Sequence, residues 1–581
     1  MSDALEEHLQ SFQTWLQDAG FELDLNTGKV WNGSVSVEWT DSDTGRSTVS
    51  EHKVSIFLPP GFPYRAPIVA SRDEPPLAPS WHLAPGLPHT LCLWDSQTGW
   101  RPHFTAQFLL RRIEDWFCNY HTDSWPADSE VPDLHRYLEG MESFVVIGDE
   151  WSPSSDKKSG KFIFGRYEHF YKTLPCLASC YGDEYLPIHL QKPETRLTEN
   201  LLFIKKDMKS VPGVWYRLAG PFVPPNNLRD LLSHIDANLE MEKGWASKAC
   251  TRVFGRKSSD DGFPLALGYA DHQGQERWLF LWAQLPPKED RKKRRKIPWS
   301  SLEGLAQITI KSFQTAPARK EDLLRRSAYL SERLSPRKAV VFGVGALGGS
   351  VAVLLAKAGM GEIRLVDSDM LMPGNVIRHV CGLNKVGFDK TEAVEQVIHA
   401  HNPDCHVICH KSAWELESLR DYCEECDVVI DTTANYNFSL YLNEVGIACN
   451  HPVVFAAAYR RAAIGRVIVR RSGNDPCLAC YVNTTWFWSE DDYPIIPVDP
   501  EGTFVEDGCG TVTEEAVALD VEAVANLTTR IAIKVMQGQL GRENLAILVN
   551  EPLTDVTNIL AQEGLHWKVN KPLENCLICR G

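Results

Sequence analysis

Residues Lys338–Lys390 read KAVVFGVGALGGSVAVLLAKAGMGEIRLVDSDMLMPGNVIRHVCGLNKVGFDK, and this stretch decides the fold of the last part of the chain. An apolar, strand-like run, Ala339–Phe342, leads into Gly343, Gly345 and Gly348 in the spacing G-x-G-x-x-G, and a helix of small residues follows. Glycine lets the backbone turn tightly and approach phosphates, while the helix N-terminus supplies free N–H groups. The stretch therefore predicts a strand, a nucleotide-binding turn and a helix.

The residues beyond the glycines indicate which nucleotide is bound. Glu362–Val366 predicts a second strand, which ends at Asp367, and a carboxylate at that place can accept the ribose hydroxyls. Asn375, Arg378 and Lys390 follow at short intervals. Cations and an amide so close to a glycine turn suit the triphosphate of ATP better than a nicotinamide dinucleotide.

The order G-x-G-x-x-G, D, N-x-x-R, G-x-x-K resembles the adenylating domain of ubiquitin-activating enzymes and their ThiF and MoeB relatives. The resemblance covers residues 319–581. It implies a Rossmann-like fold, ATP and Mg²⁺ as cofactors, and a homodimer formed through this domain. In that family a strand end carries Asp-x-x-Asp-Asn, whose second acid helps to hold Mg²⁺. Here Asp427–Asp431 is the strand, Ala434 stands at the second position, and Asp431 remains the candidate ligand.

The whole chain has the composition of a globular protein with several domains. It has 581 residues, 43% hydrophobic residues and a net charge of −16, with a pI near 5.6. This charge argues against nucleic acid or an anionic membrane as a main partner. No apolar run is long enough for a membrane span, and the acidic N-terminus does not resemble a signal peptide, so a cytoplasmic location is expected. The 16 cysteines are then metal ligands, nucleophiles or buried thiols rather than disulfides.

Residues 1–125 are expected to form an α+β domain. Helical spacing over Leu5–Ala19 is followed by strand-like runs at Gly33–Trp39 and His52–Leu58, and the helix Thr105–Trp116 ends the domain. Between them, four residues lie at spacings that resemble the core of ubiquitin-conjugating enzymes: His82, Cys92, Trp100 and Pro102.

The resemblance to ubiquitin-conjugating enzymes implies that Cys92 is a thioester-forming nucleophile. The alternative is a buried thiol, since Cys92 lies between two leucines. Leu83 and Ala84 stand where the family has Pro and Asn, and that Asn is thought to steady the oxyanion. His89 or His103 could take its place, although each is equally expected as an ordinary loop residue.

Residues 126–318 show no catalytic pattern. A linker at Pro126–Pro132 precedes strand-like runs and a helix around Leu228–Leu239, which predicts an α/β or α+β middle domain that acts as a spacer or as a degenerate partner of the adenylating domain. The basic run Lys288–Lys296 is interpreted as a solvated loop, the alternative being a docking patch for an acidic partner or a polyphosphate. Cys176 and Cys180 are interpreted as core thiols.

Two C-x-x-C pairs near the C-terminus predict a metal centre. Cys477 and Cys480 form the first pair, and Cys576 and Cys579 the second, so together they supply the four thiolates of a closed tetrahedral zinc site. The resemblance to activating enzymes supports this pairing. A third pair, Cys423 and Cys426, has no mate and is interpreted as packing.

Cys509 is the candidate for a second nucleophile. It lies between glycines, ahead of a long helix expected at Glu514–Met536, and activating enzymes carry their thioester-forming cysteine at the matching place. A helix N-terminus would lower the pKa of this thiol. The alternative is a buried cysteine at a helix cap.

A conjugating domain followed by an activating domain resembles the fused enzyme of bacterial CBASS anti-phage systems. The resemblance implies that the C-terminal glycine of a protein is adenylated, passed to Cys509, then to Cys92, and ligated to an amine of a target protein or small molecule. In that family the cargo is a cGAS-like nucleotidyltransferase. Two alternatives stay open: a ThiF- or MoeB-like activator of a sulfur carrier, and a binding scaffold with an inactive conjugating fold.

Overall fold

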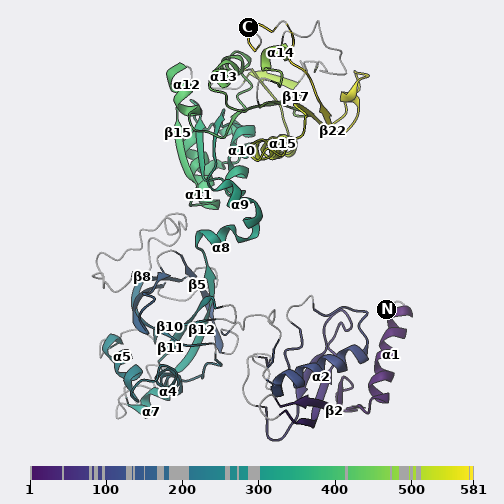
Figure 1. Ribbon diagram of the computed structural model, residues 1–581, viewed down its shortest axis with the longest axis vertical. Helices are drawn as coiled ribbons and strands as arrows, with labels where there is room; N and C mark the ends of the chain where they lie inside the picture. The colour runs from purple at the N-terminus through teal and green to yellow at the C-terminus, as the bar shows by residue number, and fades with distance from the viewer. Residues whose placement is uncertain are drawn as a thin grey trace. The chain divides into compact units, whose positions relative to one another are not determined.

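The computed structural model describes residues 3–41, 45–77, 82–83, 89–94, 99–122, 124–125, 134, 138–148, 151–166, 176–181, 209–220, 222–254, 262–270, 274–285, 301–411, 416–471, 474–482, 496, 502–505, 512–574 and 576–579 (Figure 1). The internal contacts divide the chain into two compact units, and the division falls between Ala318 and Arg319. None of the helices within the described ranges combines the length and the apolar character that a membrane-spanning helix requires.

The first sheet of the first unit is antiparallel, in the order β1-β2-β3-β4, with a helix before it and a helix after it. Its elements are α1 (Asp3–Asp18), β1 (Glu22–Leu23), β2 (Val30–Thr40), β3 (Ser47–Phe57), β4 (Ile68–Ser71) and α2 (Ala106–Thr122). Alternate residues of β2 and β3 are buried, among them Val35, Val37, Val54 and Ile56, so one face of this sheet meets the core while the other faces solvent. The helices and the two long strands expected from the sequence are confirmed.

The second sheet of this unit has eight strands in the order β5-β12-β11-β10-β9-β7-β8-β6, and β5 also pairs with β8, so the sheet closes on itself. Its strands are β5 (Glu139–Ile147), β6 (Trp151–Ser152), β7 (Ser159–Arg166), β8 (Cys176–Tyr181), β9 (Lys209–Arg217), β10 (Gly262–Ala270), β11 (Glu276–Gln284) and β12 (Thr309–Pro317). The helices packed beside it are α4 (Leu228–Asn238), α5 (Trp245–Phe254) and α7 (Leu302–Leu305). Large aromatic side chains, including Trp151, Trp215 and Phe280, fill one face of the sheet.

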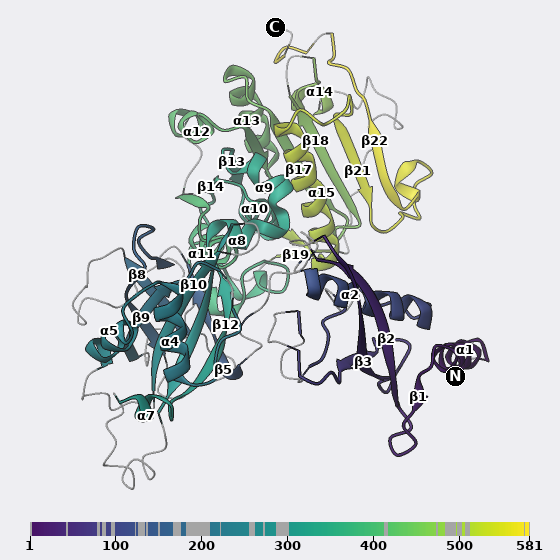
Figure 2. The same ribbon diagram turned by 60° about the horizontal axis from the view of Figure 1, so that its bottom comes forward.

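The second unit is a twisted sheet in the order β15-β14-β13-β16-β17-β18-β21-β22 (Figure 2). Its strands are β13 (Lys338–Phe342), β14 (Glu362–Val366), β15 (His406–His410), β16 (Val428–Asp431), β17 (Val453–Tyr459), β18 (Ile464–Arg470), β21 (Leu545–Val549) and β22 (Gly564–Lys568), with a separate pair β19 (Thr503–Val505) and β20 (Val512–Glu514). Strands β13 to β17 are parallel, and β18, β21 and β22 continue the sheet as antiparallel neighbours. The strand order reverses between β13 and β16, which is where open sheets of this kind bind ligands.

Helices cover both faces of this sheet. They are α8 (Lys320–Leu324), α9 (Ala328–Leu334), α10 (Ala346–Lys357), α11 (Lys390–His401), α12 (Leu416–Cys423), α13 (Tyr436–Ala448), α14 (Leu478–Val482) and α15 (Ala518–Met536), with short 3₁₀ turns η3 (Arg325–Ser327), η4 (Pro373–Asn375), η5 (Leu383–Lys385) and η7 (Ile559–Ala561). One apolar core joins the sheet to α10, α11 and α15, and a second joins it to α12 and α13. This is the layered arrangement that the glycine-turn stretch predicted.

Two helices differ from the sequence-based expectation. The helix expected at residues 320–334 is interrupted, because Ser327 leaves the helical region and its hydroxyl donates to the Leu324 carbonyl. The helix expected from Glu514 begins at Ala518, because Val512–Glu514 pairs with β19 instead.

The expected effect of that helix N-terminus on the pKa of Cys509 stays a prediction. Cys509 itself lies outside the described residues, as does the basic run at 288–296.

Candidate active site

The glycine turn after β13 is built by close packing against the end of β16. Gly343 has φ of +79°, and a Cβ there would lie 2.7 Å from the Thr433 Cα, so conformation and space both demand glycine. A Cβ on Gly348 would lie 1.9 Å from the Gly343 carbonyl oxygen. The Thr432 hydroxyl lies 2.6 Å from that same oxygen and ties the two strand ends together.

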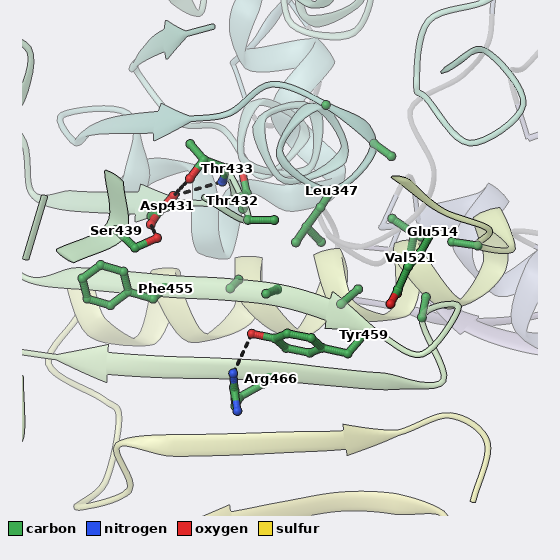
Figure 3. A pocket seen from close by; sticks show the side chains of 18 of the residues that line it. Leu347, Asp431, Thr432, Thr433, Ser439, Phe455, Tyr459, Arg466, Glu514 and Val521 are labelled. Atoms are coloured by element: carbon green, nitrogen blue, oxygen red, sulfur yellow. Dashed lines mark hydrogen bonds between the residues drawn. The ribbon is translucent and has the colours of Figure 1, made fainter. Parts of the chain in front are cut away.

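Two neighbouring cavities open at this edge of the sheet. The larger is about 770 Å³, and Figure 3 shows part of its lining. Gly345, Asn375, Arg378, Lys390 and Asp431 line it, and the sequence singled out all five. The smaller is about 230 Å³ and is lined by two more predicted residues, Gly343 and Asp367, together with Lys411, Asn435 and Phe438. The structure therefore brings the predicted nucleotide residues together around one edge.

Asp367 lies in the smaller cavity with both carboxylate oxygens in use. Oδ2 accepts the Val344 N–H at 2.7 Å and Oδ1 accepts the Asp369 N–H at 2.9 Å. These bonds fix the carboxylate beside the glycine turn, and a carboxylate has about four acceptor positions. Asp367 thus keeps acceptor capacity for the two ribose hydroxyls expected there.

Lys390 is held by a partner that the sequence analysis did not name. Its ammonium lies 2.7 Å from the Asp369 carboxylate, and its side chain is only 13% exposed. Lys390 is also the first residue of α11, where the helix dipole disfavours a cation. Asp369 balances the charge of Lys390 in this position, and the ammonium group is available to bind a phosphate that enters the cavity.

Arg378 and Asn375 occupy the other wall of the larger cavity. The Arg378 guanidinium donates to the Glu514 carbonyl oxygen at 2.7 Å, which ties the segment after β14 to β20. The Asn375 side-chain oxygen accepts the Met372 N–H at 3.0 Å and so fixes its own 3₁₀ turn. Asn375 therefore shapes the segment that carries Arg378.

His379 is a further residue of this wall, which the sequence analysis did not single out. One ring nitrogen, Nδ1, accepts the Cys381 N–H, so Nε2 carries the proton and donates to the Val344 carbonyl oxygen at 2.9 Å. Burial lowers the pKa of His379 below its usual value of 6.5, and the charge of Lys390 lowers it further. A neutral histidine therefore buttresses the glycine turn.

Asp431 is more enclosed than its predicted role suggests. It is 2% exposed, and its oxygens accept the N–H and hydroxyl of Thr433 and the hydroxyl of Ser439. Burial raises the pKa of Asp431, and these hydrogen bonds oppose the rise. Asp431 lines the larger cavity and has the donor type that Mg²⁺ prefers, but its assignment as the magnesium ligand stays a prediction.

A guanidinium that the sequence did not reveal lies on β18. Arg466 donates to the Tyr459 hydroxyl at 2.6 Å, and its Cζ lies 4.6 Å from the centre of the Tyr459 ring (Figure 3). Both residues line the larger cavity. Only the strand pairing brings them to this site, so no local motif could have found them.

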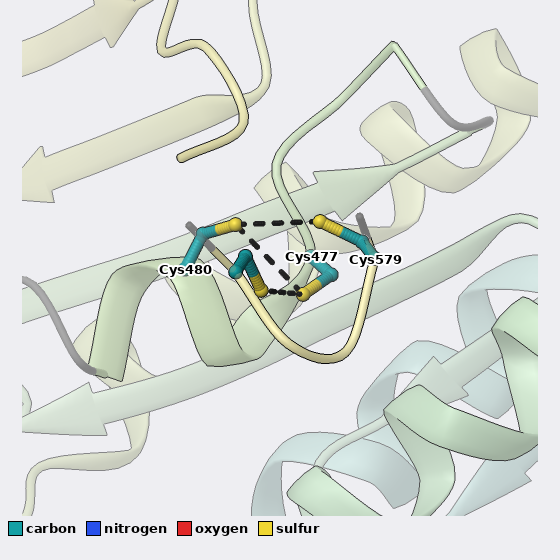
Figure 4. Close-up of side chains that lie close together, drawn as sticks. Cys477, Cys480 and Cys579 are labelled. Carbon is teal, nitrogen blue, oxygen red and sulfur yellow. Dashed lines mark hydrogen bonds between the residues drawn. The ribbon is translucent and has the colours of Figure 1, made fainter. Parts of the chain in front are cut away.

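The four predicted metal ligands converge from positions about a hundred residues apart. The sulfurs of Cys477, Cys480, Cys576 and Cys579 all lie within 4.8 Å of one another, and neighbouring pairs are 3.6–3.9 Å apart (Figure 4). Four zinc–sulfur bonds of about 2.3 Å in a tetrahedron require sulfur separations of about 3.8 Å. The set therefore fits a structural zinc ion, which would tie the C-terminal tail to α14.

The thiol chemistry of this cluster also fits a bound cation. A hydrogen bond with Cys480 lowers the pKa of Cys477 to about 5, whereas burial raises the pKa of Cys579 to about 11. Four thiols this close cannot all ionise unless a cation offsets their mutual repulsion. Asn443 orients the first pair, since its side-chain oxygen accepts the Leu478 N–H at 2.9 Å.

Cys92 lies in the first unit and is exposed, so the alternative of a buried thiol is wrong. Its neighbours Leu91 and Leu93 are each only 4% exposed, because side chains of an extended segment alternate in direction. The Cys92 N–H donates to the His82 carbonyl at 2.8 Å. Arg112 donates to the Leu93 carbonyl at 2.8 Å, which places a cation beside this segment that the sequence analysis had not singled out.

Two histidines were considered as oxyanion donors, and that role stays a prediction for both. The backbone carbonyl oxygen of His89, not its ring, accepts the Ser71 N–H, and the His103 ring packs edge-on against Phe104. Ala84 lies outside the described residues, so the group that replaces the missing asparagine is not located.

Residues 319–567 match the ThiF family, which agrees with the glycine turn, the strand order and the cations described above. The second unit therefore contains a ThiF-type domain. Adenylyltransferase and sulfurtransferase MOCS3 of Drosophila sechellia is 29% identical over 149 residues, which are 26% of this chain and 32% of that protein. The probable adenylyltransferase/sulfurtransferase MoeZ of Mycobacterium tuberculosis is 30% identical over 130 residues, 22% of this chain and 33% of that protein.

One relative is similar over most of the chain. Protein y4oA of Sinorhizobium fredii is 25% identical over 526 residues, which cover 83% of this chain and 82% of that protein. Against MOCS3 and MoeZ, by contrast, the chain spans about a third of the relative's length. Among solved structures, the crystal structure of E. coli MccB with ATP is similar, with 19% sequence identity and a TM-score of 0.33. The match covers 43% of this chain and 69% of the MccB chain.

Proposed function

We propose that this protein activates the C-terminal glycine of another protein with ATP and passes it on through two cysteines. The observation that carries the proposal is the convergence of the glycine turn, Arg378 and Lys390 on one cavity, with Asp367 in the cavity beside it. The ThiF-type domain and the adenylyltransferase relatives support the first step.

In the proposed first step, the adenosine occupies the smaller cavity and the phosphates extend past Gly345 into the larger one. The donor's terminal carboxylate attacks the α-phosphorus, the bond to the bridging oxygen breaks, and pyrophosphate leaves with that electron pair. Arg378 and Lys390 offset the charge that grows on the phosphate oxygens. Magnesium, when bound near Asp431, would neutralise phosphate charge as well.

The later steps extend the proposal to the thiols. The Cys509 thiolate attacks the acyl carbon of the adenylate and releases AMP, and Cys92 then takes the acyl group by thioester exchange. A target amine finally attacks the thioester, an amide forms, and the Cys92 thiol is restored. The exposure of Cys92 supports its role, because both the incoming thioester and the amine must reach its sulfur.

The proposed cargo is the C-terminal tail of a cGAS-like nucleotidyltransferase in a bacterial anti-phage system. It rests on the resemblance to fused activating and conjugating enzymes, as do the cytoplasmic location and the homodimer formed through the ThiF-type domain. The acceptor is an amine on a target protein or small molecule.

A second candidate is activation of a sulfur-carrier protein without conjugation. The names of MOCS3 and MoeZ, which join adenylyltransferase with sulfurtransferase, favour it. The two candidates share adenylation and differ in the product, which is a thiocarboxylate in one case and an amide in the other.

Pyrophosphate exchange tests the shared adenylation step. The purified protein should exchange labelled pyrophosphate into ATP when peptides that end in glycine are supplied, because adenylation is reversible. Arg378→Ala and Lys390→Ala should each slow exchange by about a hundredfold or more, as expected for loss of a charge-stabilising donor. Lys385→Ala is the matched control, since Lys385 lies on the same segment but does not line the cavity. Exchange that both variants retain in full would contradict the proposed site.

A further inference from the structure

The larger cavity extends beyond the phosphate-binding residues along β17 and β18. Phe455, Ala457 and Tyr459 alternate along β17 and therefore share one face of the sheet, and Arg466 pairs with Ala457 across the two strands. Ala456, Ala458 and Ala462 also line the cavity. These alanines leave room in this arm of the cavity, and the guanidinium of Arg466 supplies a positive charge there.

Tyr459 fixes this guanidinium in one orientation. The hydroxyl accepts one Nη2–H at 2.6 Å, and the guanidinium lies over the ring at 4.6 Å. A stacked guanidinium is weakly hydrated, and its forked N–H groups match a carboxylate with two parallel hydrogen bonds. The pair is therefore built to receive an anion inside the cavity.

The strand order gives the approximate spacing between β18, which carries Arg466, and β13, which leads into the glycine turn. β13, β16, β17 and β18 are consecutive neighbours in the sheet, so Arg466 lies three strand spacings, about 14 Å, from the strand that carries the glycine turn. An extended peptide covers about 14 Å with about four residues. The arginine side chain shortens that gap, so the guanidinium reaches a residue about two to four positions before the donor's last residue.

We infer that Arg466, oriented by Tyr459, is a specificity-determining residue that binds an acidic side chain a few residues before the C-terminus of the acyl donor. The inference rests on the proposed function, because it assigns the far arm of the cavity to the donor's tail. It adds a property of the substrate: the preferred tail carries Asp or Glu close to its terminal glycine.

The pyrophosphate-exchange assay, run with a series of peptide substrates, tests this assignment. The probes are synthetic peptides that end in glycine and carry Glu, Gln or Lys at each of the four preceding positions in turn. For the wild type we expect one position at which Glu lowers KM by about tenfold to a hundredfold relative to Gln, with kcat little changed, as for a partly buried charged hydrogen bond. Arg466→Glu should reverse the preference, so that Lys at that position is favoured.

Two further variants keep the test independent of folding. Tyr459→Phe should weaken the preference without reversing it, because the ring remains while the hydrogen bond is lost. Arg461→Glu is the matched control, since Arg461 lies on the same hairpin but does not line the cavity, and it should keep the wild-type preference.

The outcomes separate the inference from the proposed function. Exchange that occurs with every peptide, with no position sensitive to charge, would overturn the role of Arg466 and leave adenylation standing. A preference that survives Arg466→Glu would also overturn it. Absence of exchange with every peptide would instead count against activation of a glycine tail.

Discussion

At the scale of single residues, the site depends on side chains whose charge state is set by burial. His379 is 8% exposed, donates to the backbone of the glycine turn and accepts from Cys381, and the bond that Nδ1 accepts requires the neutral ring. Its lowered pKa means that protonation costs more in the folded protein than in the unfolded chain. His401 and His410 of the same unit are shifted in the same direction by burial.

These shifts predict how the stability of the second unit depends on pH. A base with a lowered pKa in the folded state contributes its full stability above its unfolded pKa, near 6.5, and loses it as the pH falls toward the folded value. We therefore expect the melting temperature to fall as the pH is lowered from about 7 to 5. His379→Gln should flatten that slope, and thermal melts at closely spaced pH values would measure it. An unchanged slope in the variant would contradict the buried neutral histidine.

At the scale of elements, the turn between β13 and α10 uses its glycines for different reasons. Gly348 is needed for packing, because a Cβ would overlap the Gly343 carbonyl oxygen. Gly345 has φ of −75° and open space around its missing side chain, so the free protein does not require glycine there. In the proposed mode of ATP binding, a phosphate approaches the backbone in this space.

The two glycines therefore predict different defects. Gly348→Ala should lower the free energy of unfolding by about 1–3 kcal/mol, as overpacking does. Gly345→Ala should leave stability within about 0.5 kcal/mol of the wild type but weaken ATP binding by at least about tenfold. Thermal melts and calorimetric titration with ATP would measure both. Normal ATP affinity in a stable Gly345→Ala variant would place the phosphates elsewhere.

The same elements explain what the sequence could predict. The apolar runs and the glycine spacing were enough to place β13 and β14 within one residue, and local motifs were enough to single out Arg378, Lys390 and the four cysteines as candidates. The helix expected at Glu514 failed because residues 512–514 pair with β19, a non-local contact. Tyr459 and Arg466 were missed because strand pairing, rather than spacing along the chain, brings them to the cavity. Asp369 and His379 lie beside predicted residues along the chain, and they were missed because only the folded structure shows their contacts with Lys390 and with the Val344 carbonyl oxygen.

At the scale of the whole molecule, the chain carries two candidate nucleophiles. Cys92 lies within residues 1–125, and Cys509 lies within residues 319–581. Cys92 lies in the first unit and is exposed, while the candidate ATP-binding residues lie in the second. A single chain that carries both functions raises the effective concentration for the hand-over of an acyl group. The central claim is that activation and conjugation form one relay.

Intact-mass spectrometry of serine variants, co-expressed with candidate donor proteins, tests that relay most directly. A serine at position 92 should trap the acyl group as an ester that hydrolyses more slowly than a thioester, so Cys92→Ser should carry an adduct with the mass of the donor. We expect this adduct to disappear when Cys509→Ala is added, because the acyl group must pass through Cys509 first. Two results would contradict the relay. One is an adduct on Cys92→Ser that persists without Cys509, and the other is an adduct found only at position 509 in Cys509→Ser.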